Sequence, residues 1–339
     1  MSSSVGEGTR PSLGWPFVAI WGGALLFVLI GFWVTVVALN ATVYSAAGFA
    51  RGYVAAVDRG DTSSALTLAG VTPTDQLADS LLEVPSLGGV DDVTEVGDVD
   101  LGDDTHAITL SYSMQGTSAT AEAPAQSQFV VQRAGTRFGV FQAWSFAQTP
   151  TATLDVTPQN DPRFTVDGRL VTTESGDVAT RFEVLAPSRF VLSHESAYLE
   201  APTVPVTVIS AGATSSASVA TVARASFSQT LQEQLDAMLD TDCVTQAVLL
   251  PAGCPFGRQV DDRVTGEPAW SIVAYPQVAV QPGTVSGQWL VTDAAGTAHL
   301  VVDAQSLFDG RRYAIDEDVP FTVSYTMSIG TDDVLTFQQ

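Results

Sequence analysis

Two cysteines, Cys243 and Cys254, are the only thiol residues in this chain of 339 residues, and they lie in the segment DTDCVTQAVLLPAGCPFG with ten residues between them. A structural zinc site needs about four Cys or His ligands at close spacing, and all three histidines lie far from this segment. A redox pair would have the spacing Cys-x-x-Cys. A nucleophilic cysteine needs a basic environment, whereas Asp240 and Asp242 are the charged neighbours. Outside the cytoplasm the pattern favours a disulfide, with free thiols as the alternative.

The familiar catalytic motifs are missing from the sequence. All 14 basic residues are arginine, which excludes a P-loop, a Ser-x-x-Lys acyl enzyme and a Schiff base. The motifs Gly-x-Ser-x-Gly, His-Glu-x-x-His and Gly-x-Gly-x-x-Gly do not occur either. In the run SHES, Ser193 to Ser196, neighbouring residues of a strand point to opposite faces and cannot form a triad. We therefore predict that the chain is not an enzyme and that it uses no metal and no cofactor.

Acidic residues dominate the charge of the chain. Asp and Glu total 37 and the net charge is -23, which disfavours nucleic acid as a partner because phosphates are repelled. The densest acidic run, DDVTEVGDVDLGDD from Asp91 to Asp104, resembles a calcium loop only loosely, because Gly102 takes the third ligand position of the EF-hand order. We interpret this run as a solvated strand and turn, with a weak calcium site as the alternative.

A long apolar segment lies near the N-terminus. No Asp, Glu, Lys or Arg lies between Arg10 and Arg51, a window that contains WPFVAIWGGALLFVLIGFWVTVVAL. At about 1.5 Å per residue, this segment spans roughly 36 Å, slightly more than a hydrocarbon core of about 30 Å. We predict a transmembrane helix over residues 15–40 that contacts the lipid bilayer. Trp15 and Trp33 would lie in the two membrane interfaces, about 27 Å apart along the helix.

The rival interpretation of this segment is a cleaved signal peptide with Ser45-Ala46-Ala47 as its cleavage site, but secretory apolar regions are shorter, about 15 residues at most. The arginines flanking the span do not decide its orientation. Because a long, acidic, strand-rich part is usually the translocated part, we predict a single-pass protein of the cell membrane. Residues 1–14 would form a cytoplasmic tail, and the C-terminal domains would be extracytoplasmic.

Helices followed by strands are predicted after the span, which gives an α+β domain over residues 41–148. Phe49, Tyr53 and Val57 share one helical face, and Asp61 caps a second short helix that Gly70 closes. A third helix would begin at Thr72 and turn its leucines (Leu77, Leu81 and Leu82) toward the core. From about residue 90 the apolar period changes to two, which is typical of an antiparallel sheet.

Two further domains are predicted along the chain. The segment AQTPTATLDV reads as a linker, and residues 155–222 show strand signals typical of a small β-sandwich or barrel module. Residues 223–339 again place a helix before strands and form an α+β domain with the disulfide. Ser226 and Gln229 predict a capping box at the start of that helix, whose apolar stripe contains Phe227, Leu231, Leu235, Met238 and Leu239.

Three segments carry a resemblance to known families. FARGYVAAVDRGDTSSALTLAG looks like the opening helix pair of cone-shaped domains of the nuclear transport factor two-like (cystatin-like) class. VDGRLV and VLAPSRFVLS resemble the β module of the teicoplanin-resistance-associated membrane protein family, and the cysteine segment is similar to cysteine-paired segments of actinobacterial relatives. The zinc ribbon of that family has no counterpart here, since no cysteine precedes residue 15. The resemblance implies an accessory or sensor protein of the cell envelope and transfers no catalytic residue.

A cone-shaped domain can form a pocket on its concave sheet. Phe129, Phe138, Phe141 and Trp144 would line this pocket, unless they fill the core under the helices. The predicted function is therefore a membrane-anchored, non-catalytic binding or scaffolding protein of the cell envelope, whose partner is an envelope protein or a small ligand. The alternatives are a cone-fold enzyme with a pocket carboxylate and histidine, and a purely structural envelope assembly stalk.

Overall fold

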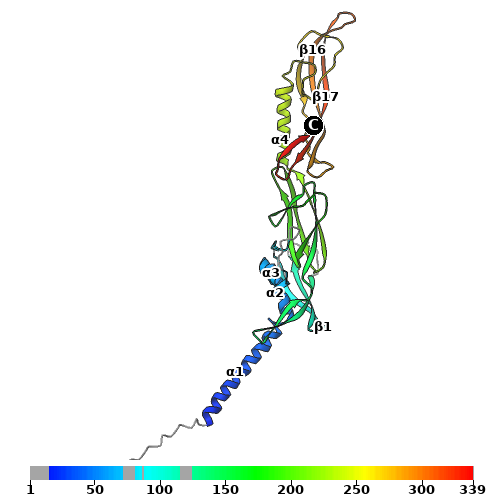
Figure 1. Ribbon diagram of the computed structural model, residues 1–339. Coiled ribbons are helices and arrows are strands. Elements are labelled where there is room, and N and C mark those ends of the chain that lie inside the picture. The colour runs from blue at the N-terminus through cyan, green and yellow to red at the C-terminus, as the bar shows by residue number, and fades with distance from the viewer. Residues whose placement is uncertain (1–14, 72–80, 86–87, 115–123, 339) are drawn as a thin grey trace, which may run out of the picture.

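The computed structural model describes residues 15–71, 81–85, 88–114 and 124–338, which form a long rod of successive modules (Figure 1). An apolar helix, α1 (Trp15–Ala41), projects from one end of the rod. We name the rest the first module (residues 46–146), the middle module (151–223) and the third module (225–338). The predicted α+β class with one N-terminal apolar helix is confirmed, and most of the remaining secondary structure is strand.

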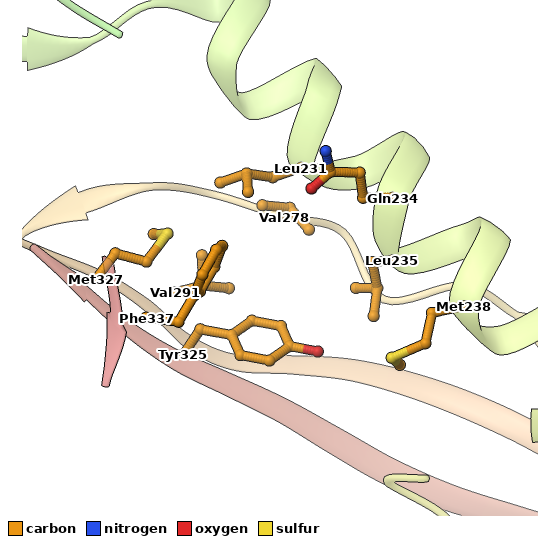
Figure 2. A pocket seen from close by; sticks show the side chains of 9 residues that line it. All are labelled: Leu231, Gln234, Leu235, Met238, Val278, Val291, Tyr325, Met327 and Phe337. Atoms are coloured by element: carbon orange, nitrogen blue, oxygen red, sulfur yellow. The ribbon is translucent and has the colours of Figure 1, made fainter. Parts of the chain in front are cut away.

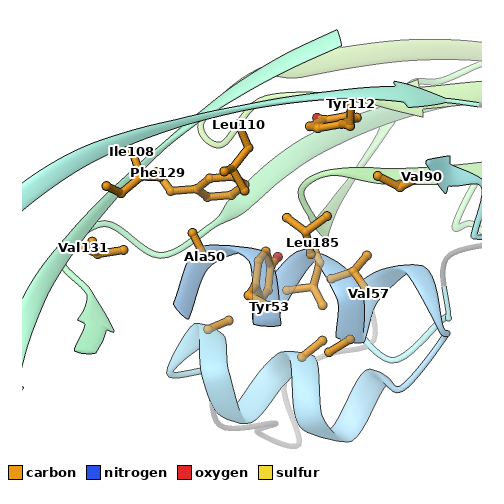
Figure 3. Packing of buried hydrophobic residues seen from close by; sticks show 14 of the residues in the cluster. Ala50, Tyr53, Val57, Val90, Ile108, Leu110, Tyr112, Phe129, Val131 and Leu185 are labelled. Carbon is orange, nitrogen blue, oxygen red and sulfur yellow. The ribbon is translucent and has the colours of Figure 1, made fainter. Parts of the chain in front are cut away.

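The first module packs two helices against one face of an antiparallel sheet (Figure 3). Its strands follow one another in the sheet in chain order, which does not by itself establish the cone shape that we expected. The helices are α2 (Ala46–Asp58) and α3 (Thr62–Ala69), and the strands are β1 (Val90–Gly102), β2 (Thr105–Met114), β3 (Ala125–Arg137) and β4 (Phe141–Phe146).

Local signals in α2 and α3 were predicted correctly. Tyr53 and Val57 are buried on one face of α2, opposite strand residues such as Ile108 and Phe129 (Figure 3). The Asp61 carboxylate accepts a hydrogen bond from the amide of Ser64 at the start of α3, and Gly70 ends α3 in the left-handed conformation. These features depend only on residues within one or two turns, so the sequence specifies them.

The segment after α3 belongs partly to the next module. Residues 72–80, which carry Leu77 and most of the predicted third helix, lie outside the described residues. Leu81 and Leu82 are buried as predicted, but in two different cores: Leu82 in the first module and Leu81 in the middle module. The amide of Leu81 donates to the carbonyl of Glu183 at 3.0 Å, which fixes the segment to the middle module.

The middle module is a β-sandwich. One sheet has the order β12-β10-β9-β6-β7, the other has the order β11-β5-β8, and Leu154, Phe182 and Phe190 lie in the core between them. The strands are β5 (Thr151–Gln159), β6 (Arg163–Val166), β7 (Arg169–Thr172), β8 (Thr180–Leu185), β9 (Ser188–Glu195), β10 (Leu199–Val208), β11 (Thr214–Ala220) and β12 (Val222–Ala223).

The predicted linker AQTPTATLDV is largely strand. β5 begins at Thr151, and the alternate residues Ala152, Leu154 and Val156 are buried in the sandwich. The small and β-branched residues that suggested a linker therefore follow the period of two of a half-buried strand. As a result, β5 follows β4 with only a short connection.

The third module packs helix α4 against a sheet built on one long hairpin (Figure 1). Phe227, Leu231, Leu235 and Leu239 of the predicted stripe are buried. The elements are α4 (Ala225–Met238), a π-helical turn η2 (Leu239–Cys243), β13 (Arg263–Val264), β14 (Ala269–Ala274), β15 (Gln281–Pro282), β16 (Gln288–Gln305), β17 (Arg312–Ile329) and β18 (Leu335–Gln338).

The predicted capping box of α4 is wrong. The helix is preceded by Arg224 in an extended conformation, without a side-chain cap. Arg224 is held in place by its amide, which donates to the carbonyl of Tyr198, and by its guanidinium, which donates to the carbonyl of Ser196. The contacts of Arg224 with the segment before β10 therefore fix the point at which the helix begins. The Gln229 side chain forms no cap and donates a hydrogen bond to Glu233 within the helix.

Buried polar contacts join the modules. Between the first and middle modules, the Tyr53 hydroxyl donates to the carbonyls of Ala186 at 2.9 Å and Pro150 at 3.2 Å. Between the middle and third modules, the Arg163 guanidinium donates to the carbonyl of Thr331 and to the carboxylate of Asp333. Because these contacts are buried or half-buried, they hold successive modules in line.

Candidate functional site: an apolar pocket beneath helix α4

A small apolar cavity of about 180 Å³ lies between α4 and the sheet of the third module (Figure 2). Helix α4 supplies one wall, the segment before β15 another, and strands β16 to β18 the floor. The lining residues are Leu231, Gln234, Leu235, Met238, Val278, Val291, Tyr325, Met327 and Phe337.

Strand register brings the floor residues to one face. Val291 of β16 is paired with Tyr325 of β17, and Met327 of β17 is paired with Phe337 of β18. Directly paired residues lie on the same face of a sheet, and residues two apart on one strand do so as well. All of these side chains therefore face α4.

Gln232 of α4 fixes the segment that carries Val278. Its amide nitrogen donates to the carbonyl of Pro276, and its amide oxygen accepts from the amide of Val278, both at 2.8 Å. The wall opposite the sheet is thus held by hydrogen bonds within the protein, which indicates that the pocket is formed before any ligand binds.

Among the described residues that line the pocket, Tyr325 alone carries a hydroxyl, and it points toward the end where Met238 lies (Figure 2). Within the described residues, this hydroxyl has no hydrogen-bond partner in the protein. Burial raises the pKa of Tyr325, so the phenol stays protonated at neutral pH. The pocket therefore offers apolar contact together with one neutral group that can donate or accept a hydrogen bond.

The predicted disulfide between Cys243 and Cys254 is present, with 5.7 Å between the two Cα atoms. It joins the turn that follows α4 to the loop that leads into the sheet, and the buried Cys243 belongs to the core of the module. The Trp270 indole donates to the carbonyl of Val248 in the same loop. The disulfide therefore fixes the end of the helix that forms one wall of the pocket.

The four aromatic residues predicted to line a pocket of the first module are dispersed. Phe129 is buried in the core, whereas Phe138 lies in the β3–β4 turn and is 87% exposed. Phe141 stacks on Tyr44 with ring centroids 4.4 Å apart. The Trp144 indole donates to the carbonyl of Tyr44. Phe129 therefore lies in the core, whereas Phe138 belongs to an exposed turn.

The remaining residues singled out in the sequence lie apart from the pocket. Trp33 is exposed on α1, and the α1 backbone begins at Trp15. The acidic run occupies β1, which is mostly exposed. Among the described residues, no group of three or more His, Cys, Asp or Glu side chains could hold a metal ion.

Two histidines form pairs with carboxylates, and neither pair borders the pocket. His106 Nδ1 lies 2.8 Å from Asp98 Oδ1 on the first module, and His299 lies between Asp316 and Asp318 on the third. A His–Asp pair can activate a nucleophile only when one lies within hydrogen-bond reach. In the described residues, no serine, threonine or cysteine hydrogen-bonds either ring.

The pocket could not be found from the sequence alone. Leu231, Leu235 and Met238 form an apolar helical stripe in the sequence, and such a stripe predicts burial without distinguishing a filled core from a cavity. Tyr325, Met327 and Phe337 lie on strands far along the chain. The spacing of Tyr325 and Met327 places both on one face of their strand. Only the register of the sheet shows that this face lies opposite α4.

A scan against protein-family models and searches of curated proteins and of solved structures found no match to this chain.

Proposed function

We propose that this chain is a single-pass, membrane-anchored protein of the cell envelope, and that its extracytoplasmic third module binds a small apolar ligand without catalysis. The observation that carries the proposal is the preformed pocket beneath α4, with its apolar lining and the free hydroxyl of Tyr325. The sequence resemblance to the teicoplanin-resistance-associated membrane protein family, and to cone-shaped binding domains, remains part of this proposal.

The membrane anchor is supported by α1 and by the residues that follow it. Ile20–Ala41 is long and apolar enough to cross a membrane. The alternative, cleavage near Ser45, would remove or shorten the start of α2, where Ser45 accepts a hydrogen bond from Gly48 and Ala46 and Ala47 are buried in the core. The disulfide favours an oxidising compartment for the third module, and hence an extracytoplasmic location.

The size and charge of the site narrow the ligand class. A cavity of about 150 Å³ holds a benzene ring, and drug-sized ligands need roughly 300 Å³ or more. The pocket of about 180 Å³ therefore fits one aromatic ring or a short branched acyl group. Since the chain carries a net charge of -23, a neutral or cationic molecule is favoured over an anion.

The methionines of the chain provide a direct test of ligand binding. Met238 and Met327 line the pocket, whereas Met114 lies in the core of the first module. In the full-length protein in lipid nanodiscs, with 13C-labelled methionine methyl groups, toluene should shift the Met238 and Met327 signals saturably and leave Met114 in place.

A matched pair of variants distinguishes filling of the pocket from the effect of adding a phenylalanine elsewhere on the same strand. Val291→Phe should fill the cavity and abolish the toluene shifts, whereas Val301→Phe, on the same strand but exposed, should retain them. The thermal transition verifies that both variants fold. Shifts of Met238 and Met327 no larger than that of Met114, or shifts unchanged in Val291→Phe, would contradict the proposal.

A structural stalk is the second candidate, and the buried contacts between modules favour it. Tyr53 joins the first and middle modules, and Arg163 joins the middle and third. If toluene leaves the pocket signals unchanged while alkaline carbonate leaves the protein in the membrane, the stalk is the better description. Release by carbonate, or an N-terminus near Ala46, would contradict the anchor itself.

A further inference from the structure

An exposed aromatic residue lies beside the outer end of α1. Phe138 is 87% exposed in the β3–β4 turn, and its backbone has a φ of 52°, in the left-handed region that a bulky side chain rarely adopts. A strained conformation that exposes an apolar ring is costly in water, and such features concentrate at functional positions. The turn contains no acidic residue, and Arg137 next to Phe138 is exposed.

Hydrogen bonds hold this turn against α1. The Asn40 side chain donates to the carbonyl of Val140 at 3.0 Å and accepts from the amide of Gln142 at 2.9 Å. Val36, one helical turn earlier, is only 3% exposed, and β4 packs against α1. Folded protein therefore covers one side of α1 from its C-terminal end as far as Val36.

The length of α1 places this contact at the membrane surface. Ile20–Ala41 is long and apolar enough to cross a membrane, and α1 itself begins at Trp15. Because folded protein covers Val36, the hydrocarbon core ends near that residue, and residues 15–35 span about 31 Å at about 1.5 Å per residue, which matches a core of about 30 Å. Asn40, one turn beyond Val36, then lies about 6 Å outside the core. Phe138 lies two residues, at most about 7 Å, from Val140, which Asn40 binds, and each headgroup layer is about 5 to 7 Å thick.

We infer that the β3–β4 turn is a second membrane contact, in which Phe138 inserts into the outer headgroup layer of the bilayer that α1 spans and Arg137 meets lipid phosphates. Aromatic rings and arginine favour this layer, because one part of it is apolar and the other is wet and anionic. Together with the Asn40 contacts, the turn fixes the first module at one orientation to the membrane. This inference rests on the membrane anchor of the proposed function.

Tryptophan fluorescence in brominated lipid tests this contact. Phe138→Trp and Phe308→Trp each add one indole at an exposed site, and Phe308 is 99% exposed in the β16–β17 turn at the far end of the rod (Figure 1). The full-length variants are placed in nanodiscs whose lipids carry bromine on the upper acyl carbons. Subtraction of the parent signal leaves the fluorescence of the added indole.

The fluorescence added by Phe138→Trp should lose most of its intensity in brominated nanodiscs and little with aqueous iodide. Phe308→Trp should show the reverse. Equal quenching of the two variants by iodide, with no effect of bromine on Phe138→Trp, overturns the contact while leaving the anchor. The parent protein reports on the anchor separately, since bromine should quench its span tryptophans Trp21 and Trp33. If the parent is not quenched, both the anchor and the contact are overturned.

Discussion

Arg163 of β6 and Asp333 of the β17–β18 turn form an ion pair between the middle and third modules, with 2.8 Å between Nη1 and Oδ1. Arg163 also binds Asp161 at 2.8 Å, and the two side chains are 6% and 1% exposed. The turn that carries Asp333 leads into β18, which supplies Phe337 to the pocket. The ion pair therefore positions part of the pocket and also holds the middle and third modules together.

Replacement of Arg163 by Met should destabilise the protein strongly. The substitution leaves Asp161 buried without its cationic partner, and removal of one member of a buried pair costs about 3 to 5 kcal/mol. Urea denaturation of the full-length protein measures the loss. Arg181→Met is the matched control, since Arg181 is 77% exposed in its pair with Asp155 and such pairs contribute at most about 1 kcal/mol. Equal effects of the two substitutions would refute the role of the buried pair.

Removal of the disulfide should weaken the third module only. A crosslink that closes a loop of this length stabilises a domain by about 3 kcal/mol, so Cys243→Ala with Cys254→Ala should lower the melting temperature of that module by several degrees. The transition of the first module should stay unchanged. Intact mass after alkylation without reduction checks the bond, and uptake of two alkyl groups would show free thiols instead.

Two glycines of α2 should respond oppositely to alanine. A Cβ at Gly48 would clash with the carbonyl oxygen of Thr42, in the backbone between α1 and α2, whereas a Cβ at Gly52 meets nothing within 4 Å. Gly52→Ala should stabilise the first module by about 0.5 to 1 kcal/mol, because alanine favours helix. Gly48→Ala should destabilise the first module and disturb the connection between α1 and α2. Thermal unfolding compares the two, and a stabilising Gly48→Ala would disprove this account of the joint.

Acid should destabilise the joint between the middle and third modules through His194. Burial lowers the pKa of this histidine, an effect that the nearby Asp161 carboxylate only partly offsets. Protons therefore bind His194 more readily in the unfolded chain than in the folded protein. The free energy of unfolding should fall as the pH drops below about 6.5, the pKa of a histidine in the unfolded chain. In a pH series of urea denaturation, His194→Leu should flatten this decline between about pH 7 and 5.

His299 is the control for that series, because its pKa shift has the opposite sign. The hydrogen bond to Asp318 raises the pKa of the exposed His299. The stability that His299 contributes is fully present below about pH 6.5, the pKa of a histidine in the unfolded chain. It is lost as the pH rises through the pKa of His299 in the folded protein. His299→Gln should therefore steepen the decline in acid. A decline unchanged by His194→Leu would contradict the assignment.

The sequence predicted those parts of the fold that depend on near neighbours. The helical face of α2, the Asp61 cap and the apolar stripe of α4 are all determined within a few turns. The disulfide was also predictable, because the two cysteines of the chain allow only one pairing within it.

Features that depend on distant neighbours were missed for physical reasons. Leu81 has the apolar character of a core residue, but nothing local indicates that its core belongs to the middle module. Arg163 reads as a surface charge until the fold brings Asp333 beside it. The pocket requires the register of β16 to β18 and the volume left beneath α4, and no single segment encodes either.

The parallel pairing of β5 with β11 has a mechanical consequence. Thr153 to Gln159 pair in order with Thr214 to Ala220, and these two strands lie near the ends at which the chain enters and leaves the middle module. Their direction follows the long axis of the rod (Figure 1), so a force that pulls the third module away from α1 draws the two strands past each other. All hydrogen bonds of the ladder then share the load at once, whereas a hairpin pulled open from its end breaks them one by one. The middle module is thus built to resist tension along the rod.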